Sequence, residues 1–351
     1  MSIKKWLAGL ATIFIVLPTS AGTIDLDSFQ AQSYLMASGA PGYSPLDILT
    51  PVDEYTGVGD MLITQGTAGT FRCTGSRIGP TQILTAAHCL TAGSNAITAT
   101  VGTIEFETPS GTEVHAIDTF SVHPDYTGLV IDGNDIAMVN LATTPSADVE
   151  TYDLYTGTDL FDNEFTKVGV GTSGVGSTGI TIPGGDKRDG ENIWDTDADL
   201  FCAILGCVAN ATDSILMGDF DSGLAANDAF GFFFDVQGIG VMPGISDLGV
   251  GPNEVGSAPG DSGGASFIDG MIAGVTSWGT TLSFVGGATS DVSPGTNSSF
   301  GEFFGDVWVG ADSNLTYISD FISSTSNPVP GPGGIVIFLL GIAGILARRQ
   351  S

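Results

Sequence analysis

Basic residues are scarce in this chain. Its 351 residues include nine Lys and Arg against 39 Asp and Glu, which gives a formal charge of −30. Such a surface repels the phosphate backbone of nucleic acids, so nucleic-acid binding is excluded. Charged residues of all kinds make up only 14% of the sequence. An architecture built mainly from charged surface helices is therefore not expected.

Apolar residues and glycine are plentiful instead. A hydrophobic content of 42% is enough for a packed core, and 51 glycines between short Val, Ile, Thr and Phe runs favour strands joined by turns. These runs fit a sandwich or a barrel. Near the end, the spacing of Leu315, Ile318 and Phe321 predicts one amphipathic helix.

Both ends of the chain carry targeting patterns. Residues 1–21 combine two lysines, an apolar stretch and small residues, which predicts a signal peptide cut by signal peptidase. An acidic lead at 22–56, a candidate propeptide, precedes the main domain at 57–323, and a Pro/Gly linker at 324–332 follows it. Residues 333–351 predict an apolar helix that ends in Arg348 and Arg349 and serves as a transient membrane anchor.

The order of features in the tail resembles the PEP-CTERM sorting signals of Gram-negative bacteria. That resemblance implies surface sorting and removal of the tail by an exosortase, although "VPGPGG" stands where that family usually has Pro-Glu-Pro. We therefore expect an exported protein, extracellular or at the cell surface.

Only four cysteines are present, and export would allow them to form disulfides. Three pairings exist, of which Cys73–Cys89 with Cys202–Cys207 is the simplest.

No metal-ligand spacing accompanies these cysteines. The stretch "DTDAD", residues 195–199, is like the start of a calcium loop, but Leu200 and Gly206 stand where an EF-hand needs a glycine and a ligand. We expect a solvated acidic turn there, and neither a metal nor a cofactor.

Ser262 lies in "GDSGG", residues 260–264. A serine hydroxyl needs a base and a set of oxyanion donors to act as a nucleophile. The three histidines, His88, His115 and His123, all precede it. This order argues against an α/β-hydrolase, in which the histidine follows the serine. His115 and His123 have no further ligand pattern and are predicted to be structural.

The motifs "LTAAHC", "NDIAMVNL", "GDSGG" and "GVTSWG" follow one another in this order. Over residues 57–323 the sequence thereby resembles the trypsin and chymotrypsin family. The resemblance implies an all-β, chymotrypsin-like fold of two six-stranded antiparallel barrels with a C-terminal helix. It also implies a serine endopeptidase that acts on polypeptides without a cofactor, and it leaves room for an insertion around 184–235.

The family's catalytic residues map onto this sequence one by one. His88 would be the general base, Asp135 its orienting carboxylate and Ser262 the nucleophile. The amides of Gly260 and Ser262 would form the oxyanion hole.

The family's substrate-binding residues map in the same way. Ser277, Trp278 and Gly279 would form the edge that pairs with substrate, and Gly256 the floor of the specificity pocket. With no carboxylate at 256, cleavage after small or apolar residues is expected. A different alignment of this loop would bring Glu254 to the pocket.

One family feature is missing. Zymogens of the family are cut before Ile-Val-Gly-Gly, and the new amino terminus pairs with the aspartate before the nucleophile, here Asp261; no such sequence occurs. The alternative reading is therefore a non-catalytic surface or matrix adhesion protein on a protease fold.

Overall fold

The structure, a computed structural model, describes residues 36–37, 49–161, 163–205, 214–282, 288–293 and 295–326. The predicted signal peptide and the predicted tail lie outside these residues, as do most of the lead and of the linker at 324–332. Within the described ranges, no helix is long and apolar enough to span a membrane. The membrane-anchoring tail therefore stays a prediction.

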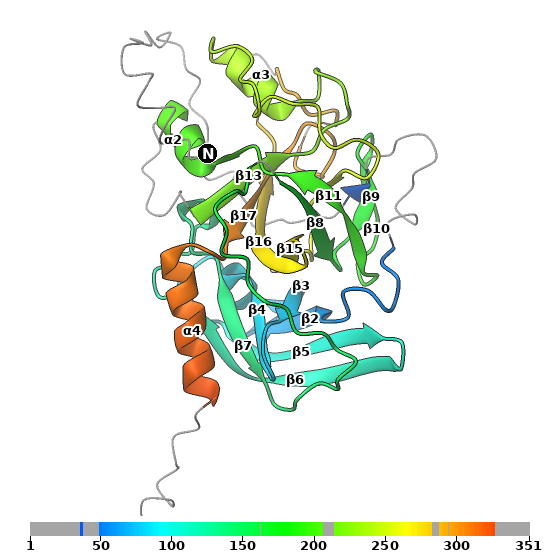
Figure 1. Cartoon of the computed structure of the whole chain (residues 1–351), viewed down its shortest axis with the longest axis vertical. Helices are drawn as coiled ribbons and strands as arrows, with labels where there is room; N and C mark the ends of the chain where they lie inside the picture. The colour runs from blue at the N-terminus through cyan, green and yellow to red at the C-terminus, as the bar shows by residue number, and fades with distance from the viewer. Residues whose placement is uncertain are drawn as a thin grey trace, which may run out of the picture.

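Two large β assemblies form most of the described molecule, one below the other in Figure 1. The lower one is a closed, antiparallel barrel with the strand order β2-β3-β4-β7-β6-β5. Its strands are β2 (Val58–Gln65), β3 (Gly69–Arg77), β4 (Gln82–Thr85), β5 (Ala99–Thr108), β6 (Gly111–Val122) and β7 (Ala137–Leu141). The predicted six-stranded first barrel is thus confirmed.

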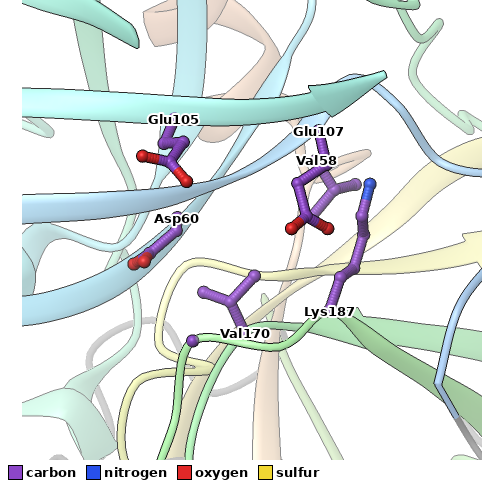
Figure 2. A pocket seen from close by; sticks show the side chains of 7 residues that line it. Val58, Asp60, Glu105, Glu107, Val170 and Lys187 are labelled. Atoms are coloured by element: carbon purple, nitrogen blue, oxygen red, sulfur yellow. The ribbon is translucent and has the colours of Figure 1, made fainter. Parts of the chain in front are cut away.

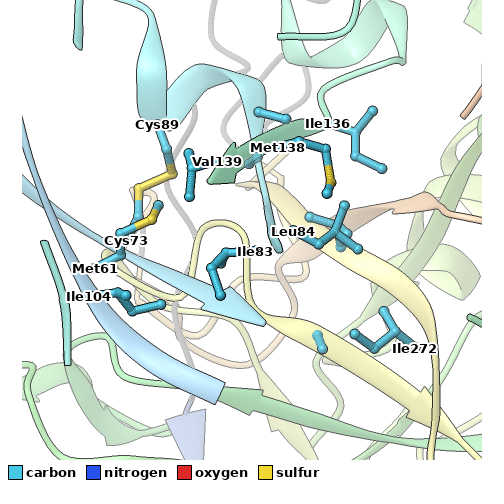
Figure 3. Packing of buried hydrophobic residues seen from close by; sticks show 14 of the residues in the cluster. Met61, Cys73, Ile83, Leu84, Cys89, Ile104, Ile136, Met138, Val139 and Ile272 are labelled. Carbon is cyan, nitrogen blue, oxygen red and sulfur yellow. A yellow bond between two sulfur atoms is a disulfide. The ribbon is translucent and has the colours of Figure 1, made fainter. Parts of the chain in front are cut away.

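The barrel closes around side chains that alternate along its strands. In β2, Met61 and Ile63 are fully buried while Leu62 between them is 40% exposed, because successive side chains point to opposite faces of a strand. Figure 3 shows Met61 and Ile104 packed beside the disulfide at the edge of this core. Each buried side chain of this size contributes roughly 1.5–3 kcal/mol, so this core is a main source of stability.

The upper assembly differs from the predicted second barrel. It is a seven-stranded sheet with the order β11-β8-β15-β16-β17-β13-β12. Its strands are β8 (Glu164–Gly169), β11 (Arg188–Ile193), β12 (Thr196–Asp197), β13 (Ile215–Asp219), β15 (Ala265–Ile268), β16 (Met271–Thr280) and β17 (Phe303–Trp308). The prediction of two closed six-stranded barrels was therefore wrong for this half.

The chain between β13 and the Ser262 loop adds no strand to this sheet. It forms the helix α3 (Ala229–Val236) and then a loop with glycines at positive φ, which are Gly238, Gly240, Gly244, Gly249 and Gly251. Glycines at such φ values interrupt regular strand structure.

Four short strands form a third sheet, in the order β10-β9-β1-β14. They are β1 (Met36–Ala37), β9 (Ser173–Val175), β10 (Gly179–Ile182) and β14 (Val255–Gly256). The pairing of β1 with β14 brings a piece of the lead next to the predicted pocket floor.

The predicted closing helix is present as α4 (Asp312–Ser326), which lies alongside β7 in Figure 1. Ile318 is buried in the barrel core, and Phe321 packs against it. The hydroxyl of Tyr317 accepts the backbone N–H of Met138 at 3.1 Å. The apolar face of the helix thus covers one side of the barrel, as its spacing predicts.

One buried polar network crosses the seven-stranded sheet. Lys167 of β8 reaches both carboxylate oxygens of Asp306 of β17, at 2.6 and 2.8 Å, and donates to Thr276 of β16 at 3.0 Å. Ser266 of β15 also donates to Asp306, at 2.7 Å. Four neighbouring strands are thus joined by side chains as well as by their backbones.

Candidate active site

His88 and Asp135 meet at the end of the barrel. His88 lies in the short helix η2 (Ala87–Leu90), directly after β4, and Asp135 lies just before β7. The strands β4 and β7 are paired, which brings the two residues together. His88 Nδ1 lies 2.6 Å from Asp135 Oδ2, and the His88 backbone N–H donates to Oδ1 at 2.8 Å.

Asp135 is fully buried and well satisfied. Besides His88, the hydroxyl of Ser277 donates to its Oδ2 at 2.5 Å. A carboxylate in this position only accepts, so Nδ1 of His88 carries the proton and Nε2 is left as the basic nitrogen. The arrangement can therefore draw a proton from a group placed at Nε2.

The loop that carries Ser262 is fixed against strand β3. The backbone N–H of Thr74 donates to the carbonyl of Ser262 at 2.8 Å, and its hydroxyl donates to the carbonyl of Gly260, also at 2.8 Å. Cys89 Sγ lies 3.6 Å from the Ser262 carbonyl oxygen and 4.0 Å from His88 Nε2. One sulfur atom thus lies close to both residues.

Two peptide groups in this loop have a defined direction. The carbonyl of Pro259 accepts from Thr172 at 2.8 Å, and that of Asp261 accepts from Gly264 at 2.7 Å. In a trans peptide the N–H points opposite to the C=O. The N–H groups of Gly260 and Ser262 are therefore directed away from these internal partners. Gly260 adopts φ +105°, a conformation that favours glycine.

Asp261 faces the other way, into the sheet, and is fully buried. Its Oδ1 accepts the N–H of Gly171 at 2.7 Å, and its Oδ2 accepts the N–H of Ala258 at 2.9 Å. A Cβ at Gly169 would lie 2.1 Å from Oδ1, so glycine is required beneath this carboxylate.

The disulfide between Cys73 and Cys89 is present and joins β3 to η2. It braces the segment that carries His88. Cys202 lies in α2 (Ala198–Leu205). Cys207 lies outside the described residues, so the Cys202–Cys207 pair stays a prediction.

The trypsin family model matches residues 58–192 of the chain. This span holds His88 and Asp135 in the geometry described above, whereas Ser262 lies beyond it. The chain carries a trypsin-like serine protease domain. It is a serine endopeptidase, a hydrolase.

No curated protein matches the chain. Among solved structures, a structure of HL collagenase is 17% identical, and the match covers 80% of this chain and 98% of that chain with a TM-score of 0.49. The name of that protein describes its own activity and transfers no substrate to this protease domain.

Two predicted substrate-binding residues of the protease share a cavity. Gly256 and Gly279 line a small cavity, together with Phe220 and Glu302. A Cβ built on Gly256 would lie 2.9 Å from the ring of Phe220. The wall behind Gly256 is therefore apolar and leaves no room for a larger residue at 256.

The other two predicted substrate-binding residues lie behind this cavity. Ser277 and Trp278 are fully buried, and Ser277 is bonded to Asp135. The ring of Trp278 covers Gly305, where a Cβ would lie 2.2 Å from it. Their side chains support the protease site and do not line the cavity.

Glu302 is the carboxylate of the cavity, and the sequence analysis missed it. It lies beyond every quoted motif, and its only signal was an acidic residue inside the apolar run "FGEFFG". Its Oε1 accepts the N–H groups of Asn297 at 2.9 Å and Ser299 at 3.1 Å. Burial raises the pKa of Glu302 to about 7.

Glu254, the alternative for the pocket floor, does not line the cavity. Its Oε1 accepts the N–H of Asp221 at 2.5 Å, and its Oε2 accepts that of Val250 at 2.9 Å. Burial raises the pKa of Glu254 to about 9. This side chain therefore stabilises the backbone of the loop behind the pocket.

A second small cavity lies between the barrel and the segment after β8 (Figure 2). Asp60 and Glu105 face it from paired positions on β2 and β5, and Lys187 lines it from the opposite side. Arg72 pairs with Asp60 at 2.9 Å, and its Cγ would lie 3.4 Å from a Cβ on Gly260. Arg72 thus links this cavity to the loop that carries Ser262.

The remaining two histidines are structural within the described residues. His115 lies 2.8 Å from the hydroxyl of Thr143, and His123 stacks edge-on with Tyr317. Burial lowers the pKa of His123.

Proposed function

We propose that this protease domain cleaves polypeptides through Ser262, His88 and Asp135. Ser262 Oγ attacks the carbonyl carbon of the peptide bond while His88 Nε2 takes its proton. The proton then goes to the leaving amine, and water hydrolyses the acyl-enzyme by the reverse transfer. The bond between His88 and Asp135 at 2.6 Å is the observation that carries this proposal.

The amides of Gly260 and Ser262 are proposed as the oxyanion hole. The direction of their peptide groups, opposite to the bound carbonyls of Pro259 and Asp261, supports this role. Removal of one such donor typically costs about 10²–10³ in rate.

Casein turnover by the mature protein tests this function. We expect Ser262→Ala to abolish turnover, because no other described residue replaces its hydroxyl. Ser266→Ala is the matched control, since Ser266 is also buried but bonds to Asp306. Equal turnover by wild type and Ser262→Ala would contradict the proposal.

Cleavage after small or apolar residues is proposed, on the apolar wall that Phe220 forms behind Gly256. The test compares kcat/KM for peptides that differ only in the residue before the cut: Ala, Val, Phe or Lys. The peptides with Ala, Val or Phe should have a higher kcat/KM than the peptide with Lys. A preference for Lys that disappears in Glu302→Gln would instead assign the specificity to Glu302.

Asp261 is proposed as the partner of a new amino terminus. The strand β1 supports this, because Met36 pairs with Gly256, five residues before Asp261 in the chain. A cut in the lead upstream of Met36 would release an amino group in this neighbourhood. Amino-terminal sequencing of the active enzyme should find such a cut; full activity with an intact lead would contradict it.

We further propose export by signal peptidase, transient anchoring by the tail, and release at the cell surface by an exosortase. The patterns at 1–21 and 333–351 support this. Mass spectrometry of the protein recovered from its cells should show a start near Gly22 or later and no Arg348–Arg349 pair. An intact tail would contradict exosortase processing.

The adhesion reading, a surface or matrix protein on a protease fold, is not favoured by the trypsin family match. Casein turnover separates the two readings.

A further inference from the structure

Three aspartates come together behind the specificity pocket. Asp219 ends β13, Asp221 follows it, and Asp228 caps the start of α3. One carboxylate oxygen from each lies within 4.8 Å of the other two, and all three residues are buried. Carboxylates this close repel one another unless a proton or a cation lies among them.

Asp221 is the residue that most needs a further partner. It is 3% exposed, and its Oδ1 has no hydrogen-bond partner among the described residues. By contrast, Asp219 Oδ2 accepts from Ala229 at 2.7 Å and from Phe230 at 3.1 Å. An unsatisfied carboxylate at this depth is costly, so this oxygen indicates a missing ligand.

Two further acidic side chains surround this cluster. Glu254 is buried and bonds to the backbone of Asp221, and Asp195 is buried nearby, close enough to Asp219 for their charges to interact. Asp195 begins "DTDAD", so the predicted solvated acidic turn was wrong at this residue. None of the ion pairs in the described ranges brings a Lys, Arg or His to Asp219, Asp221 or Asp228.

We propose that Asp219, Asp221 and Asp228 bind one calcium ion. The ligands are all oxygens, which hard divalent cations prefer, whereas zinc favours nitrogen and sulfur. Two oxygens on opposite sides of a calcium ion lie up to about 5 Å apart, and about 4.2 Å apart around magnesium. Three oxygens within 4.8 Å of one another are close enough to share one such ion. A buried set of protein ligands suits calcium, because magnesium usually keeps several of its waters.

The ion would act on the pocket through Phe220, the residue between Asp219 and Asp221. Phe220 packs with Ala258 and Phe300 and forms the wall behind Gly256. Calcium would hold this wall in place. This consequence rests on the proposed function, whereas calcium binding itself does not.

Calorimetric titration of the EDTA-treated, full mature chain with CaCl₂ tests the site, with thermal unfolding as a second readout. We expect one calcium per chain, weaker binding of MgCl₂, and a rise in Tm with calcium. No heat and no change in Tm at millimolar calcium would overturn the proposal, whatever the proteolytic activity proves to be.

Variants separate ligation from folding. Asp221→Asn should weaken calcium binding at least tenfold, yet its calcium-free Tm should match or exceed that of the wild type, because a buried charge is removed. Asp228→Asn keeps a good helix cap and should also lose affinity. Asp235→Asn, on the exposed end of α3, is the control and should bind normally. Unchanged affinity in both Asp221→Asn and Asp228→Asn would overturn the proposal.

Discussion

At the scale of single residues, Asp135 connects His88 of the barrel to Ser277 of the seven-stranded sheet. It accepts from the ring and the backbone of His88 and from the hydroxyl of Ser277. Asparagine at 135 would present an N–H₂ group to His88 and favour the wrong tautomer. We expect Asp135→Asn to lower kcat on the order of 10⁴-fold.

Steady-state kinetics on one peptide substrate check this expectation. Ser277→Ala, which removes one of the donors but keeps the carboxylate, should cost much less, roughly tenfold, about the worth of one hydrogen bond. Retention of more than a tenth of the activity by Asp135→Asn would count against the role of Asp135.

Glu302 makes stability depend on pH. Its pKa is about 7 in the folded protein against an ordinary 4.5, so the folded state keeps a proton that the unfolded chain has released between these values. The stabilisation is complete below pH 4.5 and is lost as pH rises through 7. We expect the wild type to lose up to about 3 kcal/mol over this range from Glu302.

Urea unfolding at pH 5 and pH 8 measures this loss. Glu302→Gln keeps an oxygen for the N–H groups of Asn297 and Ser299 and cannot titrate. The free energy of unfolding of Glu302→Gln, relative to that of the wild type, should therefore increase as pH rises. An identical difference between the two proteins at both pH values would show that Glu302 is not the group responsible.

The sequence predicted some of these residues and not others. His88, Asp135 and Ser262 each stand in a short motif whose neighbours are local, so the sequence alone was enough to propose them. Glu302 and Phe220 reach the pocket only through the pairing of β13 with β17 and the loops beside it. No spacing along the chain encodes that contact.

At the scale of elements, the disulfide ties β3 to η2. Its two cysteines are 16 residues apart, and closing a loop of this size stabilises the fold by about 3 kcal/mol. We expect the double change Cys73→Ala and Cys89→Ala to lower the free energy of unfolding by about that amount in urea titrations. It should also lower kcat, because Cys89 contacts both His88 and Ser262.

Reduction of the wild-type protein offers an independent check of the disulfide. Dithiothreitol should lower the stability of the wild type by more than that of the double variant, which retains only the predicted Cys202–Cys207 pair. A double variant as stable as the oxidised wild type would contradict the expectation.

The buried Lys167–Asp306 pair joins strands of the seven-stranded sheet, much as the disulfide joins β3 to η2. Burial lowers the pKa of Lys167, and Asp306 opposes that change. Lys167→Met would leave Asp306 buried without its cation, and we expect a loss of about 3–5 kcal/mol in unfolding experiments. The double variant Lys167→Met with Asp306→Asn should lose less stability than Lys167→Met alone. A double variant that is less stable than Lys167→Met would argue against this pairing.

The sequence predicts the barrel strands and α4 but not α3, and the difference has a physical reason. The barrel strands alternate and α4 has a clear apolar face, so their patterns show in the sequence. The run "AFGFFFDV" contains residues that favour strands, yet it forms α3. There Asp228 caps the helix by accepting the N–H of Gly231, and Phe230, Phe233 and Phe234 are buried. Tertiary packing outweighed local preference.

At the scale of the whole molecule, the proposed site lies where the two halves meet. His88 and Asp135 come from the barrel, whereas Ser262 and Ser277 come from the seven-stranded half. Thr74 of the barrel fixes the Ser262 loop by two hydrogen bonds across this junction. A reactive Ser262 therefore reports that both halves are folded and docked.

Covalent labelling with a fluorophosphonate, located by peptide mass mapping, tests this claim most directly. The account predicts one adduct per chain, on Ser262, with none in Ser262→Ala and a much slower reaction in His88→Ala. An adduct that persists undiminished in Ser262→Ala, or a wild-type protein that takes up no label after its lead is removed, would contradict it.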